Sequence, residues 1–214
     1  MLRTLTLSIE TKKNHQAIGA VQLSFSLKKI PQRKQTSMPT RDAIVLLALY
    51  NASMNTRLYA AAATLPKAVL SADRGAFFGS ILGTLNHIVA GDTIWLRRFM
   101  AHPSDFPALK PMGDIAAPAS LAHIYSDDLD VLLELRGRLD GIIEALAAGL
   151  SDQDLAQPLV YTNSRGDFRK NFGSLLLHFF NHQTHHRGQA GTLLFQSGVD
   201  MGATDLLEWL PEHC

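Results

Sequence analysis

The 214-residue chain has a single cysteine, Cys214, which is its last residue. One cysteine excludes an intrachain disulfide, so nothing in the sequence points to an oxidising compartment. No apolar run is long enough to span a membrane, and none has the layout of a secretory signal. We therefore expect a cytoplasmic protein that does not bind membranes.

The chain also lacks an excess of either charge, because 20 lysine and arginine residues are nearly balanced by 19 acidic residues, which leaves a net charge of +1. Such a balance gives no reason to expect nucleic acid as a partner. The positive charge is uneven, since Glu10 is the only acidic residue in the otherwise basic segment 1–38. We expect residues 1–39 to be an extension or linker and residues 40–214 to be one domain.

The basic extension has two competing interpretations. In "VQLSFSL" (21–27) apolar and polar residues alternate, which is the period of a strand and would suit a small hairpin. In the other interpretation the extension is disordered and "KKIPQRKQTSMPTRD" (28–42) is a linker. Met38 would then be a candidate initiator, and residues 1–37 would not belong to the native product.

From Thr40 onward the apolar residues recur with a helical period. The expected helices span about 40–65, 74–102, 121–149 and 172–196. Asp73 and Ser120 are the expected N-caps of the second and third helices. A short hairpin with its turn at 163–166 is expected before the fourth helix. Four helices of this length predict an all-α protein folded as a four-helix bundle.

Histidine is concentrated in "LLHFFNHQTHHRGQ" (176–189), which holds four of the nine histidines: His178, His182, His185 and His186. A spacing of four residues places two imidazoles on adjacent turns of one helix face, as in metal sites carried by helices. Two such pairs are available, His178/His182 and His182/His186. The sequence pattern leaves both pairs open.

Two ligands rarely hold a metal, so a third ligand should come from a neighbouring helix. His87 is the histidine that lies well inside another expected helix. Small residues, Gly83 and Gly91 among them, share its helix face and would let another helix or a ligand approach closely. Three neutral nitrogen ligands would leave a divalent ion with its full charge and with open positions, able to acidify a bound water or thiol.

A purely structural role for the histidines competes with this interpretation, because a lone buried histidine commonly just packs in a core. Burying several unpaired imidazoles would cost about 1–3 kcal/mol for each unsatisfied group, and a shared metal would remove that cost. The cluster lacks the glutamate of an H-E-x-x-H motif, so the sequence does not support a zincin protease. No G-x-S-x-G elbow or Walker phosphate loop is present either.

Three segments carry a family resemblance: "LGTLNHIVAGDTIWLRRF" (82–99), "LLHFFNHQTHHRGQAGTLLFQSGVD" (176–200) and "TDLLEWLP" (204–211). Over about residues 40–211 the chain resembles the DinB family of metal-binding four-helix bundles, which is named for a damage-inducible protein. The resemblance implies a divalent metal held by His87, His182 and His186. Zinc or nickel is the implied ion, and iron or manganese also suits nitrogen ligands. His178 and His185 are then left with supporting roles.

Several polar residues are candidates for hydrogen bonds to the metal-binding histidines or for ordinary packing: Asn86, Asp92, Tyr161, Asn181 and Gln189. No residue beyond the three ligands is assigned a catalytic role. Trp95 is expected in the core or at an interface rather than in contact with a cofactor.

The resemblance includes thiol-dependent isomerases and S-transferases. It therefore implies a metal-dependent enzyme that activates a low-molecular-weight thiol for attack on an electrophilic small molecule. A metal-dependent hydrolase and a non-enzymatic, metal-stabilised stress-response bundle are the alternatives. Members of the family commonly pair, and "GAFFGSILG" (75–83) offers apolar surface, so we also expect a homodimer.

Overall fold

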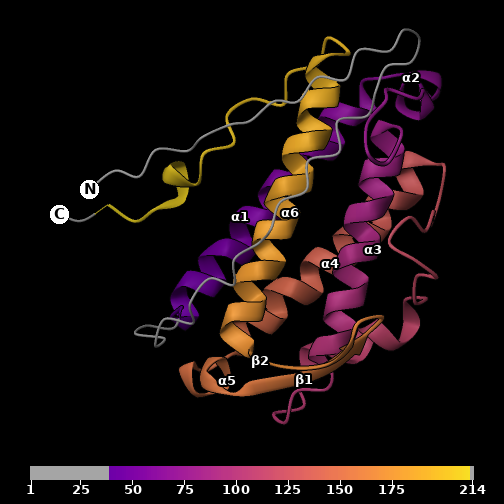
Figure 1. Cartoon of the computed structure of the whole chain (residues 1–214). Helices are drawn as coiled ribbons and strands as arrows, with labels where there is room; N and C mark the ends of the chain where they lie inside the picture. Colours follow the sequence, from indigo (N-terminus) through magenta and orange to yellow (C-terminus); the bar gives the residue numbers. More distant parts are fainter. Residues whose placement is uncertain (1–38, 213–214) are drawn as a thin grey trace, which may run out of the picture. The chain divides into compact units, whose positions relative to one another are not determined.

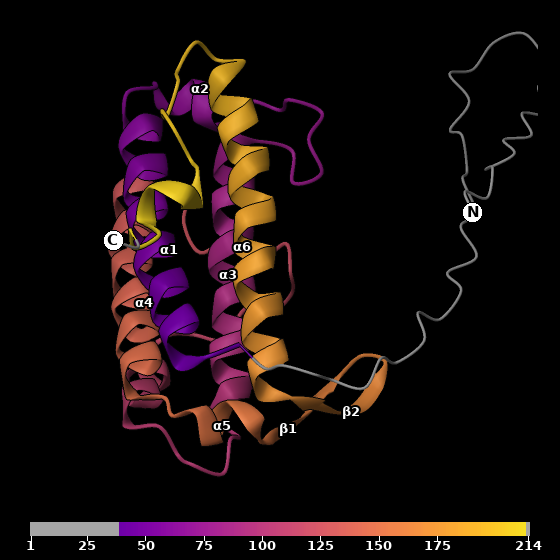
Figure 2. The same cartoon turned by 90° about the vertical axis from the view of Figure 1, so that its left-hand side faces the viewer.

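The computed structural model describes residues 39–212, and four long helices account for much of this segment. They lie side by side in Figures 1 and 2: α1 (Arg41–Ala63), α3 (Ile81–Phe99), α4 (Leu129–Gly149) and α6 (Phe172–Phe195). Shorter elements occupy the connections, α2 (Lys67–Ser71), η1 (Pro107–Asp114) and α5 (Asp152–Ala156), and η2 (Leu206–Trp209) follows α6. The mostly helical prediction is confirmed. None of the helices in residues 39–212 combines the length and apolarity that crossing a membrane requires.

Two features of the sequence discussed above fall outside the described residues. The interpretations of residues 1–38, as a hairpin or as a linker, concern a segment that the structure does not describe. The same holds for Cys214, the only cysteine of the chain.

Contacts between helix ends define the direction of α4. The Lys67 Nζ donates to Asp127 Oδ2 at 2.9 Å, which places the start of α4 beside α2. At the other end, the backbone N–H of Arg41 donates to Asp152 Oδ1 at 2.8 Å, so the start of α1 lies near the end of α4. Helices α1 and α4 are therefore antiparallel. The connection 100–128 has to return along the whole length of α3, and part of it borders the site described below.

Helix α3 begins later than the sequence predicts. Ser80 is its N-cap and accepts from the Gly83 N–H at 3.0 Å. Asp73, the expected cap, instead accepts from the Gly75 N–H at 2.9 Å within a loop. Gly75 and Gly79 adopt positive φ angles of 65° and 74°, which no helix accommodates. The prediction of a helix from residue 74 to 102 was therefore wrong at its beginning, and it extended the helix about three residues too far at its end.

Helix α4 also begins later than expected. Asp128 caps it by accepting from the Asp130 N–H at 2.9 Å, whereas Ser120 accepts from the Ala122 N–H at 3.2 Å in a turn. Asn86 of α3 explains the difference, because its Oδ1 accepts from the backbone N–H of Tyr125 at 2.7 Å. This contact holds the segment before α4 in an extended path along α3. The bounds of α1 and α6, by contrast, agree with the prediction to within about two residues.

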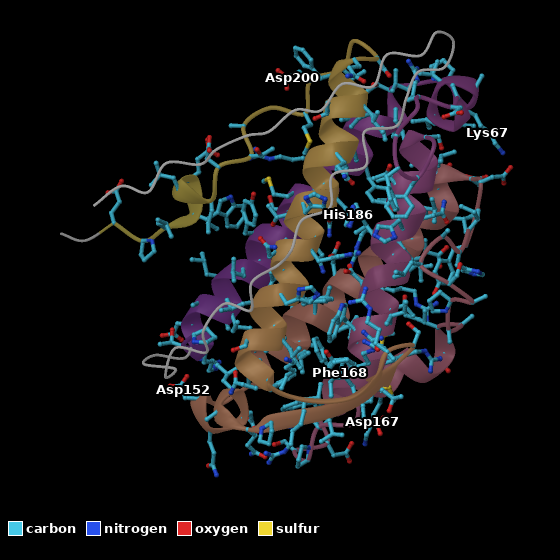
Figure 3. The ribbon with its side chains drawn as sticks, viewed as in Figure 1. Lys67, Asp152, Asp167, Phe168, His186 and Asp200 are labelled. Carbon is cyan, nitrogen blue, oxygen red and sulfur yellow. The ribbon has the colours of Figure 1, made fainter. Side chains whose placement is uncertain are left out.

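An antiparallel hairpin joins α5 to α6. Strands β1 (Pro158–Asn163) and β2 (Gly166–Asn171) pair from Pro158 opposite Asn171 to Asn163 opposite Gly166. Gly166 has a φ of 116°, which only glycine adopts readily. Figure 3 shows Asp167 and Phe168 on this hairpin, near the lower ends of the long helices. The expected hairpin is confirmed, and the fold is mostly helical rather than purely α-helical.

A buried charged cluster connects all four long helices. Arg136 of α4 pairs with Asp92 of α3 and, at 3.0 Å, with Asp140 one turn along its own helix. Asn51 of α1 donates from Nδ2 to Asp140 at 3.2 Å and accepts through Oδ1 from Arg187 of α6. Two guanidinium groups thus balance two carboxylates, which is how charge is tolerated in a core. Burial raises the pKa of Asp92 to about 6, although Arg136 opposes the rise.

Candidate metal centre

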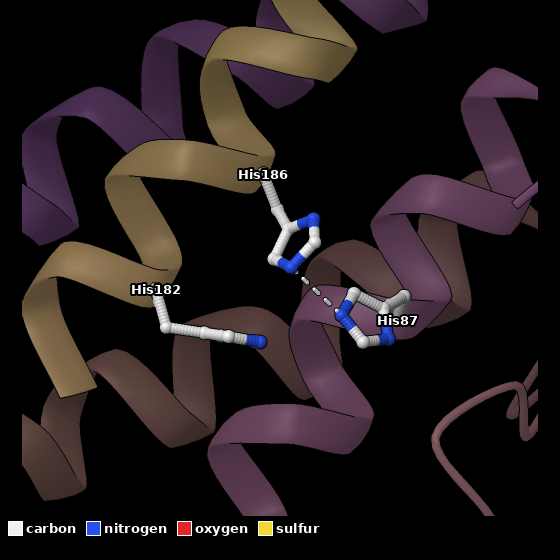
Figure 4. A group of neighbouring side chains, drawn as sticks. All are labelled: His87, His182 and His186. Atoms are coloured by element: carbon white, nitrogen blue, oxygen red, sulfur yellow. Dashed lines mark hydrogen bonds between the residues drawn. The ribbon is translucent and has the colours of Figure 1, made fainter. Parts of the chain in front are cut away.

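Three histidines from two helices converge near the middle of the structure (Figure 4). His87 comes from α3, and His182 and His186 come from adjacent turns of α6. One ring nitrogen of each lies within 4.8 Å of the others, and the Nε2 atoms of His87 and His186 are 3.0 Å apart. Nitrogens about 2.0–2.1 Å from a tetrahedral zinc ion are about 3.3 Å from one another. The histidine triad (His87, His182, His186) can therefore hold a metal ion.

Hydrogen bonds at the far side of two rings define which nitrogen is free. His87 Nδ1 lies 2.7 Å from the backbone oxygen of Leu121, and because a carbonyl only accepts, Nδ1 carries the proton. His186 Nδ1 lies 2.7 Å from Gln189 Oε1 in the same relationship. Each neutral ring then presents the lone pair of Nε2 to the other, so no hydrogen bond can form between them. A cation between the two Nε2 atoms would satisfy both, which is the arrangement of metal-binding histidines.

All three rings of the triad favour the neutral form. Burial, together with the neighbouring His186 and His87, lowers the pKa of His182 to about 3. Burial also lowers the pKa of His87 and that of His186, although the hydrogen bonds that their Nδ1–H groups donate to the Leu121 carbonyl oxygen and to Gln189 Oε1 oppose the shift. Neutral imidazole is the form that binds metals. At neutral pH the donor set is therefore deprotonated without any input from a metal.

Gly91 of α3 makes room for the His182 ring. A Cβ atom at this position would lie 2.8 Å from Cε1 of His182, closer than side chains pack. The helical period places Gly91 on the same face as His87, where a small residue lets another helix or a ligand come close. The ring of His182 is the group that uses this space.

Phe78 covers the triad, a role that its sequence context does not indicate. Its ring stacks on His87, with centroids 3.7 Å apart and planes at 15°, and it contacts the edge of His186 at 5.6 Å. The loop that carries Phe78 passes so close to α3 that a Cβ at Gly83 would overlap the Phe78 carbonyl oxygen. The sequence placed Phe78 in an expected helix, so nothing signalled this role.

The other two histidines of the cluster lie outside the triad. The ring of His178 is 6.2 Å from that of His182 and packs against the edge of Trp95 at 5.1 Å. His185 is exposed, and its ring lies 4.8 Å from the ring of His186. Of the two pairs that the spacing left open, the structure brings His182 and His186 to His87.

The candidate supporting residues have different roles. Gln189 contacts His186 directly, as described above. Asn86 acts on the triad indirectly. Its side chain accepts a hydrogen bond from the backbone N–H of Tyr125 and so holds the loop that follows Leu121, the residue whose carbonyl contacts His87. Asp92 pairs with Arg136 instead of with a histidine. Asn181 is exposed, and Tyr161 packs against the edge of Trp95 with centroids 5.4 Å apart.

A cavity of about 620 Å³ opens beside the triad. Its walls are part of α3 (91–98), the loop 118–121, the hairpin turn 163–165, and His178 and His182 of α6. We call it the triad cavity. Its volume is in the range of small-molecule sites, and Trp95 lies in its wall rather than only in the core.

Comparison with known proteins identifies the family of the chain. The sequence model of the DinB family matches residues 36–212, a range that includes all three histidines of the triad. The chain is also 27% identical over 158 residues to Protein DinB of Bacillus subtilis (strain 168), which covers 73% of this chain and 87% of that protein. No solved structure matched the chain. The family match extends over most of the sequence, and the chain therefore belongs to the DinB family.

Proposed function

We propose that this protein is a metal-dependent enzyme, built on a DinB-like four-helix bundle, that activates a low-molecular-weight thiol for S-transfer or isomerisation of an electrophilic small molecule. The observation that carries the proposal is the convergence of neutral histidine nitrogens at the wall of a cavity. His87, His182 and His186 would hold the ion. Zinc and nickel are the first candidates, and iron and manganese also suit such donors.

The donor set favours chemistry over a purely structural metal. Structural zinc sites are usually closed by four protein ligands, several of them thiolates, whereas three histidines leave a position open. A divalent ion held by the three histidines would stabilise a thiolate bound at the open position relative to the thiol, and so would raise the fraction of nucleophile at neutral pH. Leu121 and Gln189 would keep the two Nε2 lone pairs directed inward throughout.

The sulfur nucleophile would come from a small molecule, because residues 39–212 contain no cysteine. In S-transfer the thiol loses its proton, its sulfur forms a bond to an electrophilic carbon, and the leaving group departs with the electron pair of the broken bond. In isomerisation the thiol adds to the substrate and is later eliminated unchanged. The triad cavity is large enough for the reacting part of both molecules.

Metal content provides the first test. The wild type, His182→Ala and His178→Ala would be purified without chelators or affinity histidines and analysed by mass spectrometry of the metals. We expect near-stoichiometric metal in the wild type and in His178→Ala, and loss of metal in His182→Ala. His178→Ala is the matched control, since it removes a histidine from the same helix outside the triad. Absence of metal from the wild type, even after reconstitution, would end the proposal.

Cobalt substitution tests the thiol step. A thiol that reaches the ion should change the visible absorption spectrum of the cobalt protein, and a thioether of the same size should not. If thiols leave the spectrum unchanged while ester or amide substrates are hydrolysed, a hydrolase replaces the thiol enzyme. If metal removal lowers the melting temperature and no substrate turns over, the metal is purely structural, as in a stress-response bundle without enzymatic activity.

A further inference from the structure

The triad cavity has an unusual charge. Two arginines line it, Arg98 of α3 and Arg165 of the hairpin turn, and no aspartate or glutamate is among its lining residues. The positive groups and His182 thus face the same space. Since residues 39–212 carry more acidic residues than lysine and arginine residues, a purely positive lining calls for an explanation.

Arg98 is held in place without an anionic partner. Its Cζ lies 4.7 Å above the ring of Trp95 and 5.1 Å from the ring of Tyr161. Stacking uses the faces of the guanidinium and leaves the N–H groups at its edge. Within residues 39–212 no carboxylate lies within ion-pair distance of Arg98, and no hydrogen bond from its side chain is formed. Burial lowers its pKa, the direction expected of a cation that lacks a carboxylate.

The neighbouring arginines of the interior behave differently. Arg97, one residue earlier, donates from Nη2 to the backbone oxygen of Ile115 at 2.7 Å. Arg136 pairs with two carboxylates, as described above. Arg98 therefore differs from both in being positioned by aromatic rings with its donors left for another acceptor.

The hairpin brings the second arginine to the same cavity. Arg165 occupies the turn between β1 and β2, where its backbone N–H donates to Asn163 Oδ1 at 2.8 Å. This bond and the positive φ of Gly166 define the shape of the turn. Its exposed side chain has no ion-pair partner among the described residues. The small sheet thus adds a cation to the wall opposite α3.

We propose that the triad cavity binds the carboxylate or phosphate group of an organic anion through Arg98 and Arg165. Arginine suits such groups because its fork of N–H donors matches two oxygens at once. The inference that this anion is the thiol or the electrophile rests on the proposed function, whereas the anion site itself does not. The molecule that reacts at the triad then carries its negative charge several bonds away from its reacting atom.

The test measures anion binding to the metal-free protein, so that no ion contributes. Trp95 lies under Arg98 and reports on it by fluorescence, in a Trp209→Phe background that removes the other tryptophan. Glutarate and its uncharged diamide, glutaramide, are the matched probes, and methyl phosphate distinguishes phosphate from carboxylate. We expect saturable binding of glutarate, methyl phosphate or both, and at least tenfold weaker binding of glutaramide.

Variants locate the site. Arg98→Gln and Arg165→Gln should each weaken binding of the preferred anion at least tenfold. Arg169→Gln is the matched control, because it removes one positive charge from an exposed residue of the same hairpin that does not line the cavity. If Arg98→Gln does not fold, Arg165→Gln decides the outcome, since its side chain is exposed. Equal binding of glutarate and glutaramide, or variants that bind the anion as the wild type does, would overturn the inference.

The outcomes separate this inference from the proposed function. Anion binding that needs Arg98, in a protein whose cobalt form ignores thiols, would leave the anion site standing and remove the thiol enzyme. A cobalt spectrum that changes with thiols, in a protein whose triad cavity binds no anion, would support the thiol enzyme and remove the anion site.

Discussion

Gly91 lies directly beneath the imidazole of His182, at a distance that leaves no room for a methyl group. The two residues belong to different helices, α3 and α6, so their contact sets how closely these helices approach at the triad. A glycine inside a helix is ordinarily a cost of about 1 kcal/mol relative to alanine. Its presence at this position is explained by the ring that rests on it.

Gly91→Ala should lower metal affinity at least about tenfold, because the new Cβ would lie 2.8 Å from Cε1 and displace the His182 ring. Competition with a chromophoric chelator measures the affinity. Gly137→Ala on α4 is the control, since a Cβ there would meet nothing within 4 Å. It should leave metal binding unchanged and slightly stabilise the helix. Equal affinities of the two variants would show that the ring does not depend on Gly91.

Metal binding should be insensitive to mild acid. The pKa of His182 is lowered to about 3 and those of His87 and His186 are also lowered, so protons compete for these nitrogens at a lower pH than for ordinary histidines, whose pKa is 6.5. We expect nearly constant affinity for metal between about pH 7.5 and pH 6, whereas ordinary histidines would lose affinity as they protonate. A steep loss of affinity that begins near 6.5 would contradict the lowered pKa values.

The same lowered pKa values predict how the metal-free protein responds to acid. Below pH 6.5 the histidines of the unfolded chain bind protons, whereas those of the folded triad stay neutral. The free energy of unfolding should therefore fall as the pH decreases through this range. Melting temperatures of the chelated protein at several pH values measure the effect. His182→Asn should flatten the dependence, because it removes the ring with the largest shift.

Arg136→Met should destabilise the protein by about 3–5 kcal/mol, since it leaves the carboxylates of Asp92 and Asp140 buried without their cation. Urea unfolding measures the free energy. The loss should be smaller at pH 5 than at pH 8, because an unpaired Asp92 is protonated more readily at the lower pH. The double variant Arg136→Met/Asp92→Asn should recover part of the loss, and failure to recover any would mean that the ion pair is not the source of the effect.

We propose that homodimers form through the loop before α3. Phe77 is 87% exposed in that loop, within the apolar segment from which pairing was predicted. Phe77→Ser should shift the protein toward monomer in sedimentation velocity experiments at micromolar concentration. Val160→Ser, which changes a residue that is 56% exposed on β1, is the control. A wild type that is monomeric at all concentrations, or a Phe77→Ser variant that associates normally, would refute this interface.

The local pattern of the chain was enough to predict the helices and the histidine cluster. Apolar residues at helical spacing located α1 and α6 closely, because a long amphipathic period depends little on what packs against it. The i, i+4 spacing of His182 and His186 likewise guarantees that both side chains leave the same face of one helix. The pairing of these two with His87, rather than of His178 with His182, came from family resemblance and not from spacing.

The starts of α3 and α4 could not be read from local signals. Asp73 and Ser120 are good capping residues, and each does form a turn, but tertiary contacts decide whether a helix follows. Because the Phe78 loop passes close over Gly83, α3 begins at a later residue than predicted, and the hydrogen bonds of Asn86 have the same effect on the start of α4. Such contacts join residues far apart in the sequence, so no periodicity reports them.

Spacing along the chain is enough to establish that this protein is mostly helical and carries a histidine pair suited to a metal. The packing of separate elements establishes which nitrogen of His87 is free, through the Leu121 carbonyl, and that Arg98 and Arg165 share a cavity with His182. Spacing cannot report these two properties, because proton positions and cavity charge depend on groups brought together from separate elements. Chemistry at the site is therefore a property of the packing, even though its ligands are visible in the chain.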